Sequence, residues 1–280
     1  MEVPVLLKQI AAAAAQDELL FPTGGVAFKL QRLLDDPDCT SAQLAMLVQA
    51  EPLLAARVVA VANSVAYNRS GRAINDIRSA LSRLGFDTLR VLAVAVVARQ
   101  LEGMTHGALH QRLAARLWQH TAHVAALSRI IARRVTHVDP ESAFFAGIIH
   151  ELGGFYLISR AENYPGLLAG EDGSLIAWNE GGAAAVGAAV LSRLNVPAGI
   201  LAAIEGLWSG YIALPPRTLA DTLLLADQLA PVESPLSELA GTGREGIAAE
   251  IDLVFDDQTL SGILAESAEE VASLTDALRV

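Results

Sequence analysis

The sequence has few cysteines, few aromatic residues and no long uncharged run. Its single cysteine, Cys39, excludes a disulfide framework and a zinc finger with cysteine ligands. Aromatic residues make up 5% although hydrophobic residues reach 52%, so the apolar content is mostly alanine, leucine and valine. Runs without charge reach about a dozen residues, whereas a membrane-spanning helix needs roughly 20. The N-terminus also lacks a signal-peptide layout. We therefore expect a cytoplasmic protein with an aliphatic core and no membrane partner.

Several catalytic motifs are also missing from the sequence. It has no Walker A loop, no Gly-x-Gly-x-x-Gly, no Gly-x-Ser-x-Gly elbow and no His-Glu-x-x-His. Cys39 lies in an acidic turn, which raises the pKa of a thiol, and no residue stands out as its partner. These absences argue against several common nucleotide-binding and hydrolase classes.

Negative charge is concentrated at one end of the chain. The total of 20 basic and 31 acidic residues gives a net charge of −11. Residues 233–280 hold two basic and eleven acidic side chains, so 2 − 11 = −9 falls there. Residues 91–134 hold six basic side chains and one acidic. We do not expect nucleic acid as a partner, which needs a basic face. Charge complementarity suggests instead that the acidic tail docks on 91–134.

Apolar residues recur with helical periodicity along most of the chain, and no alternating strand pattern is present. The sequence therefore predicts an all-α fold of two packed helical layers or subdomains. Helix starts are predicted at Thr40 or Ser41, at Pro52, at Pro140 and at Thr218. Gly85 is predicted to end one helix, and residues 109–135 to form one long amphipathic helix.

Histidines are the main candidates for chemistry. The six are His106, His110, His120, His123, His137 and His150. His120 and His123 are one helical turn apart, His150 precedes Glu151, and Asp227 follows an apolar run. Imidazole and carboxylate ligands suit iron, manganese and similar divalent ions. The alternative to a metal site is a purely structural role, with surface histidines and an aspartate that caps a helix or forms an ion pair. The spacing alone leaves both interpretations open.

The arginines of residues 109–135 also allow two interpretations. Arg112, Arg116, Arg129 and Arg133 are spaced by four, thirteen and four residues. They form either a stripe that faces phosphate or a series of ion pairs and solvated side chains.

One pattern in the first third of the chain is specific. The pattern contains Asn63-Ser64-x-x-Tyr67 and, further on, Ala80-x-x-x-Leu84-Gly85. It is preceded by Glu51-Pro52 and the apolar residues 53–56. On composition alone, Asn63-Ser64 is simply a helix end. Together these elements resemble the HDOD domain, the HD-related output domain of bacterial signalling proteins, which usually has Asp-Pro in place of Glu51-Pro52. The resemblance covers roughly residues 20–230.

The second half resembles the body of an HD-type phosphohydrolase. The resemblance implies that His120 and His150 match the two histidine positions and that Asp227 matches the last aspartate. Glu151 stands where the family pattern has aspartate. Related HD-GYP phosphodiesterases carry further histidines for a second metal, whose places here are Ala183-Ala184 and Leu207-Trp208. A two-metal centre is therefore not expected, and a single divalent metal remains open.

The resemblance implies a helical bundle over 1–105, an HD-like subdomain over 106–232 and an acidic helical tail over 233–280. We expect a non-catalytic signal-transduction protein that needs no cofactor. Its ligand would be a signalling protein, such as a nucleotide-second-messenger enzyme or a kinase, or a small signalling molecule in the degenerate pocket. The alternatives are a one-metal phosphohydrolase or nucleotide phosphodiesterase that uses His120, His150, Glu151 and Asp227, and an assembly scaffold. Homo-oligomerisation is left open.

Overall fold

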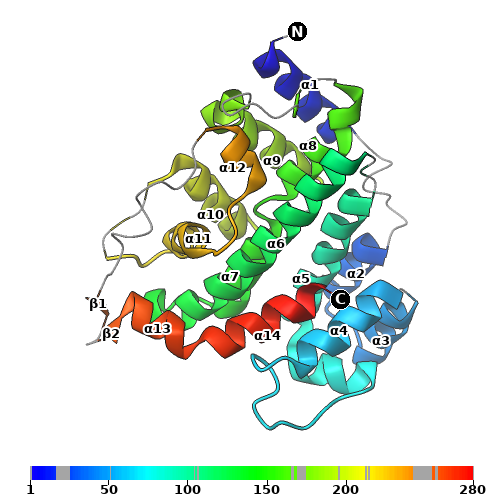
Figure 1. The fold of residues 1–280 in the computed structure, drawn as a ribbon. Coiled ribbons are helices and arrows are strands. Elements are labelled where there is room, and N and C mark those ends of the chain that lie inside the picture. Colours follow the sequence, from blue (N-terminus) through cyan, green and yellow to red (C-terminus); the bar gives the residue numbers. More distant parts are fainter. Residues whose placement is uncertain are drawn as a thin grey trace.

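The chain folds into a helical assembly around a long central helix, α6 (Figure 1). The computed structural model describes residues 2–16, 26–50, 52–103, 105, 107–164, 167–168, 175–194, 196–211, 213, 215–241, 254–255 and 258–279. Its α-helices are α1 (Val3–Gln16), α2 (Val26–Leu34), α3 (Ser41–Gln49), α4 (Pro52–Asn63), α5 (Ile77–Gly103), α6 (Ala108–Ile131), α7 (Pro140–Ile149), α8 (Leu152–Arg160), α9 (Ala183–Ser192), α10 (Ala198–Ser209), α11 (Leu219–Leu229), α12 (Pro235–Leu239), α13 (Leu260–Glu266) and α14 (Ala268–Arg279).

Non-α elements are short. Two π-helical segments, η1 (Ala132–Thr136) and η3 (Trp178–Gly182), and one 3₁₀ turn, η2 (Ala161–Asn163), adjoin the helices. Within the described part of the chain, strand structure is limited to an antiparallel pair, β1 (Val254–Phe255) and β2 (Gln258–Thr259), of two residues each. The predicted all-α fold is confirmed.

The predicted helix starts are present, and capping explains them. Thr40 caps α3 through a capping box with Gln43, and Thr218 caps α11 through a second box with Asp221. Pro52 opens α4, and Pro140 follows the N-cap residue of α7. The threonine side chains accept from a backbone N–H that the first turn leaves without a partner, and a proline in the first turn has no N–H that would need one.

One predicted helix boundary is confirmed and another differs in detail. Gly85 breaks the helical geometry as predicted, with φ 77° and ψ 174°, and a second helical stretch follows it within α5. The predicted helix over 109–135 becomes α6 followed directly by the π-helical η1. His137 then ends the segment in a left-handed conformation with φ 55°.

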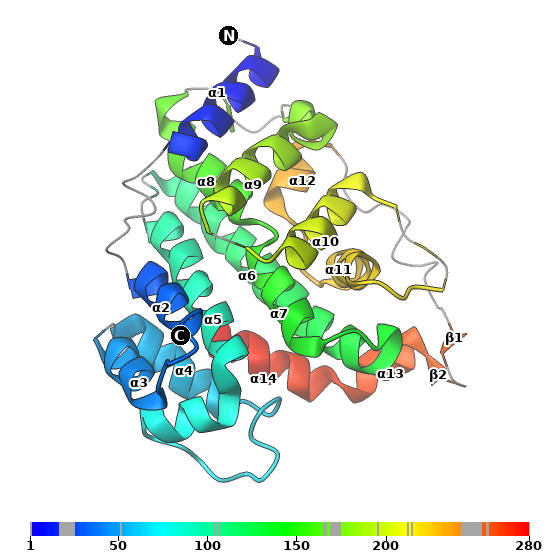
Figure 2. The ribbon, with the colours of Figure 1, turned by 180° about the vertical axis from the view of Figure 1, so that it is seen from behind.

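The helices form two groups that share one core. Helices α2 to α5 pack together at one end of the molecule, and α6 to α12 form the larger group (Figures 1 and 2). Helix α5 joins the groups because it packs on α7 and α8 as well as on α2, α3 and α4. Buried residues of both groups, such as Leu44, Leu92 and Phe144, belong to one continuous apolar cluster. Continuous burial of this kind makes the two groups mutually stabilising.

The division of the chain into 1–105, 106–232 and 233–280 stays a prediction. Two helices, one near each end of the chain, pack differently from that division. Helix α1 packs on α9 and η3, far from α3 and α4, although it was placed in the bundle of 1–105 (Figure 2). Its buried Leu7, Ile10 and Ala14 provide the apolar face for that contact. Helix α12, placed in the tail of 233–280, packs on α6 and belongs to the larger group. Of the predicted tail helix, residues 245–253 lie outside the described residues.

The acidic tail does lie on the basic stretch, as charge complementarity predicted. Glu270 of α14 pairs with Arg129 and Arg133 of the α6–η1 segment, at 3.0 and 2.7 Å. Arg116 of α6 pairs with Glu238 of α12. The arginine series thus takes part in ion pairs, which favours that interpretation over a phosphate-facing stripe.

Within the described part of the chain, one unbroken helical stretch, Pro140–Asn163, is long and apolar enough to meet the length and composition criteria for a membrane span. Its most apolar window is 83% buried against other helices of the protein. That burial is the environment of a core helix pair, α7 and α8.

Candidate functional site

His120, His150, Glu151 and Asp227 come together although they are far apart in the sequence. His120 lies in the middle of α6, His150 and Glu151 link α7 to α8, and Asp227 lies in α11. A close approach of α6 and α7 places the first three. A Cβ atom at Gly147 would lie 2.5 Å from the Cα atom of Ala125, so only glycine permits this helix separation.

Both imidazoles direct the same ring atom toward the centre of the cluster. The Nε2 atom of His120 lies 3.3 Å from Nε2 of His150 and 3.2 Å from Oδ1 of Asp227. Each Nδ1 atom contacts a backbone carbonyl oxygen, that of Val232 for His120 at 2.9 Å and that of Gly147 for His150 at 2.8 Å. These contacts favour a proton on Nδ1 of each ring. Nε2 of His150 is then an acceptor, whereas Nε2 of His120 donates to Asp227 when His120 is protonated. Both Nε2 atoms are the ligand atoms that a metal ion would take in place of that proton.

Glu151 reaches the cluster despite the extra methylene that distinguishes it from aspartate. One ligand atom from each of His120, His150 and Glu151 lies within 4.8 Å of the others. Ser234 donates a hydrogen bond to Oε1 of Glu151 at 2.8 Å. A Cβ atom at Gly154 would lie 2.7 Å from Oε2, so the glycine provides the space for this carboxylate.

The cluster separates the protonation states of its members. Burial and the charge of His120 lower the pKa of His150 to about 4, so His150 is neutral at pH 7. Burial opposes the charge on His120, but the hydrogen bond and negative charge of Asp227 outweigh it and raise the pKa of His120. Burial raises the pKa of Glu151. The structure thus provides a place for one positive charge between two Nε2 atoms and the carboxylates.

A divalent ion fits this donor set. Two nitrogen ligands at about 2.1 Å from an ion in near-tetrahedral geometry lie about 3.4 Å apart, close to the observed separation of the two Nε2 atoms. Backbone carbonyls already orient both rings, as they do around metal-bound histidines. His120, His150 and Glu151 therefore offer a donor set that could hold one divalent ion, and Oδ1 of Asp227 lies 3.2 Å from Nε2 of His120 beside it.

A pocket of about 430 Å³ opens beside the cluster. His150, Glu151 and Asp227 line it, together with Trp178 and Trp208. The positions at which the HD-GYP resemblance implies further histidines also line the pocket, and they are Ala183, Ala184, Leu207 and Trp208. None of these side chains except the tryptophan indole has a polar atom, and none is a metal ligand. These four positions of the described lining therefore supply no ligand for a second metal.

The pocket lining is acidic rather than basic. Glu151, Asp227 and Glu233 are its carboxylates, and neither lysine nor arginine is among its described lining residues. A phosphorylated ligand would therefore meet negative charge unless a cation were bound first.

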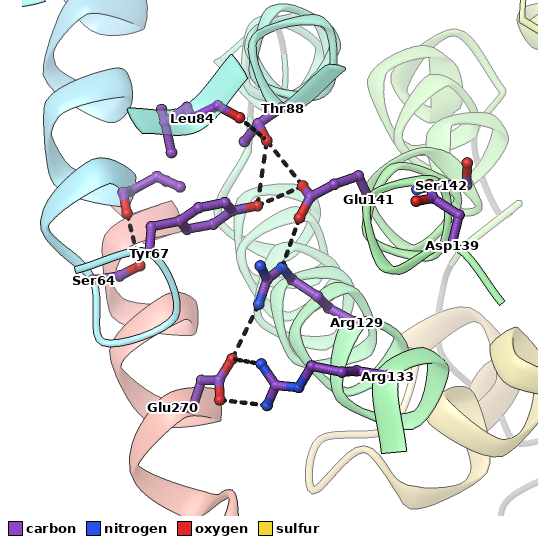
Figure 3. Close-up of polar contacts among 11 residues, drawn as sticks. Ser64, Tyr67, Leu84, Thr88, Arg129, Arg133, Asp139, Glu141, Ser142 and Glu270 are labelled. Carbon is purple, nitrogen blue, oxygen red and sulfur yellow. Dashed lines mark hydrogen bonds and ion pairs between the residues drawn. The ribbon is translucent and has the colours of Figure 1, made fainter. Parts of the chain in front are cut away.

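The motif residues Asn63, Ser64, Tyr67 and Gly85 lie elsewhere, between the two helical groups. Asn63 bridges the backbone N–H and C=O of Ile74, at 2.8 and 2.7 Å, and Ser64 donates to the carbonyl of Val61. Tyr67 donates to Oε2 of Glu141 at 2.6 Å (Figure 3). The motif thus shapes the loop after α4 and fastens it to α7, and it contributes nothing to the pocket.

The other described histidines stay outside the cluster. His123 accompanies His120 on α6, but its ring contacts the carbonyl of Gln119. Nδ1 of His110 lies 3.9 Å from Oε1 of Glu162, and His137 is exposed. His106 lies outside the described residues.

Sequence reasoning missed several residues that support the site. Ser234 donates a hydrogen bond to Glu151, and Gly147 permits the close contact of α6 and α7. Glu141 accepts the hydrogen bond from Tyr67 of the motif. No local pattern identifies them, because each acts on residues far away in the sequence. A three-dimensional packing argument alone finds them.

Comparison with known proteins supports the fold. A structure from Shewanella amazonensis, provisionally named a metal-dependent phosphohydrolase, has a TM-score of 0.67 at 19% identity and covers 98% of each chain. An HDOD domain protein of unknown function from Geobacter sulfurreducens has a TM-score of 0.61 at 21% identity, covering 98% of this chain and 97% of that one. A protein from Marinobacter aquaeolei, provisionally assigned to signal transduction, has a TM-score of 0.57 at 18% identity, covering 100% and 67%.

These identities establish a shared fold and no more. No protein of curated function matches the chain. The family model of the HDOD domain, however, matches residues 20–207, about two thirds of the sequence. With that match, the motif around Asn63 to Gly85 and the helical architecture, the chain belongs to the HDOD domain family.

Proposed function

We propose that this protein is a cytoplasmic, non-catalytic component of bacterial signal transduction that acts by binding a protein partner. The observation that supports this proposal best is the set of side chains that line the pocket. Ala183, Ala184 and Leu207 stand where a two-metal phosphodiesterase would need histidines. The pocket keeps the cluster of His120, His150, Glu151 and Asp227 but lacks the second half of a two-metal clamp.

The cluster would hold one divalent ion in this proposal. His120 and His150 would supply Nε2 ligands, and Glu151 and Asp227 would supply oxygen. When bound, the ion would supply positive charge at the floor of an acidic pocket and polarise a bound oxygen. The residues of the chain itself fix the geometry, because Val232, Gly147 and Ser234 orient their partners without it.

A one-metal phosphohydrolase is the second candidate, and the convergence of all four predicted ligands favours it. Such an enzyme would use the ion both to bind an anionic substrate and to activate water. The acidic lining makes the ion a requirement for any phosphorylated ligand, so metal content is the decisive quantity.

The test measures metal content and hydrolysis in parallel. Purified full-length protein is analysed for Fe, Mn, Ni and Zn and assayed on p-nitrophenyl phosphate and on a cyclic dinucleotide. His150→Ala is compared with His123→Ala, which removes an imidazole outside the cluster. Our proposal expects at most one ion per chain, lost in His150→Ala only, and no hydrolysis. Hydrolysis that is lost in His150→Ala but kept in His123→Ala establishes the enzyme instead.

A further inference from the structure

The last helix, α14, lies against α6 and also contacts α4 (Figures 1 and 2). Glu270 forms its polar anchor. Oε1 of Glu270 accepts hydrogen bonds from Arg129 and Arg133 at 3.0 and 2.9 Å, and Oε2 accepts a second bond from Arg133 at 2.7 Å (Figure 3). Charge-assisted bonds of this forked kind are the stronger ones in proteins.

The face of α14 that contacts the rest of the protein is amphipathic. Glu270, Leu274 and Leu278 recur at intervals of four residues, which places them on one side of α14. Leu274 and Leu278 are fully buried, while Glu266, at the end of α13, pairs with Arg134 at 3.0 Å. A carboxylate followed by two leucines is thus the main feature of the contact face of α14.

The surface that receives α14 is ordered by residues outside the tail. Oε2 of Glu141 accepts bonds from the hydroxyls of Tyr67 and Thr88, at 2.6 and 2.9 Å, and its Oε1 accepts from Nε of Arg129 at 3.1 Å. The guanidinium of Arg129 also lies 4.4 Å from the ring centre of Tyr67. Arg129 is therefore fixed by two neighbours, with Nη1 directed at the position of Glu270 (Figure 3).

Departure of α14 would leave a preformed site. Arg129 would keep Glu141 and Tyr67, whereas Arg133 has Glu270 as its one partner among the described residues. The backbone N–H of Val65, which donates to Ser273 at 3.0 Å, would lose its acceptor. We call this surface, made by Val65, Tyr67, Arg129 and Arg133, the α14 site. Its two arginines suit a carboxylate on a helix whose same face continues with apolar side chains, as in α14.

We propose that the α14 site is a receptor for an acidic amphipathic helix of a partner protein and that α14 occupies it until the partner displaces it. The family match ends at residue 207, so the HDOD part builds the site and a later segment supplies the occupant. The inference rests on the proposed function in taking a protein as the partner. A preordered site lowers the cost of binding for any helix that fits it.

The test uses full-length protein and a fluorescent peptide of residues 261–279 as the probe. Glu270→Arg places a third positive charge at the anchor and should release α14, seen as faster hydrogen exchange in 268–279. The variant should then bind the peptide at least about tenfold more tightly than the wild type, in which the tethered helix competes at high effective concentration. Glu269→Arg, the same charge change at an exposed neighbouring position, should match the wild type.

A charge swap provides the rescue. Arg133→Glu combined with Glu270→Arg should restore slow exchange in α14 and abolish binding of the peptide. The milder Glu270→Gln gives the same comparison if Glu270→Arg loses its helical circular dichroism. Unchanged exchange, or peptide binding equal to that of Glu269→Arg, overturns the proposal. So does a dimer of Glu270→Arg by light scattering in which α14 is exchanged, because the partner is then a second copy.

Phosphoester hydrolysis measured on the same variants separates the two proposals. Hydrolysis unmasked by Glu270→Arg would overturn the non-catalytic function while the peptide result stands by itself. Absent hydrolysis together with absent peptide binding would overturn the receptor site and leave the proposed function in place.

Discussion

At the scale of single residues, the cluster depends on histidines whose two nitrogens have separate tasks. Nδ1 of His120 and of His150 contacts a backbone carbonyl, and Nε2 faces the centre. Because the two Nε2 atoms lie 3.3 Å apart, one proton or one cation between them interacts with both rings. This arrangement makes the site sensitive to pH and to metal.

The pH dependence of stability should carry the signature of His150. Its folded pKa of about 4 lies below the ordinary value of 6.5, so the unfolded chain binds a proton that the folded protein excludes. The free energy of unfolding should therefore fall as the pH decreases from 7 to 4. The folded pKa of His120 is raised, so His120 adds to the free energy of unfolding at low pH. That stabilising contribution is lost as the pH rises.

His150→Gln should reduce this loss of stability by up to about 3 kcal/mol at pH 4. Urea unfolding of both proteins in EDTA, at pH 7 and pH 4, measures the difference without interference from metal. His123→Gln is the control and should follow the wild type. Equal pH slopes for the wild type and His150→Gln would contradict the burial of a neutral His150.

Gly147 gives a second residue-scale prediction. An alanine at this position would press its Cβ atom against the backbone of Ala125, so Gly147→Ala should destabilise the protein by about 1–3 kcal/mol. Gly199→Ala in α10, where a Cβ atom meets nothing within 4 Å, should be neutral or stabilising by about 0.5–1 kcal/mol. Denaturant unfolding checks both, and equal effects would argue against the close contact of α6 and α7.

At the scale of elements, the break in α5 separates a helix of the first group from one that reaches α7. Gly85 allows the break because its φ of 77° is accessible to glycine and costs other residues backbone strain. No atom lies within 4 Å of a Cβ built there, so the requirement is conformational rather than steric.

Gly85→Ala should therefore cost about 1–3 kcal/mol through backbone strain alone. Gly85→Asn should cost about as much, because asparagine tolerates the left-handed region at ψ of about +30 to +60°, whereas the ψ of 174° at Gly85 lies in a region essentially restricted to glycine. Thermal unfolding of the two variants measures both costs. If neither variant is destabilised, or if asparagine restores the stability that alanine loses, the strain argument fails.

At the scale of the whole molecule, one polar network fastens the two helical groups and the tail together. Glu141 of α7 accepts from Tyr67 after α4, from Thr88 of α5 and from Arg129 of α6, and Arg129 in turn binds Glu270 (Figure 3). Glu141 and His150 belong to the same short segment that begins with α7, so the network and the pocket share one rigid helix. Changes at either end are expected to act on a common element.

Tyr67→Phe should cost about 1–2 kcal/mol, because it removes the hydroxyl that donates to Glu141 in a largely buried position. In a Glu141→Gln background the same change should cost clearly less, since the charged acceptor is gone. A double-mutant cycle by urea unfolding measures this coupling. Additive effects would show that the bond contributes little to joining the groups.

The sequence alone determined the fold class, most helix starts and the membership of the four cluster residues. Helical periodicity, capping residues such as Thr40 and Thr218, and prolines at first turns are local signals, so a linear pattern carries them. The four candidate ligands followed from the family resemblance, and the structure brings them together.

Only the tertiary structure decided how the helices share their surfaces. It placed α1 on α9, brought α12 into the pocket wall and fitted the longer Glu151 beside Gly154. It also seated Glu270 between Arg129 and Arg133, where charge counting predicted only that tail and basic stretch attract. The physical reason is that packing and ion pairing join residues by distance in space, and a sequence pattern records distance along the chain.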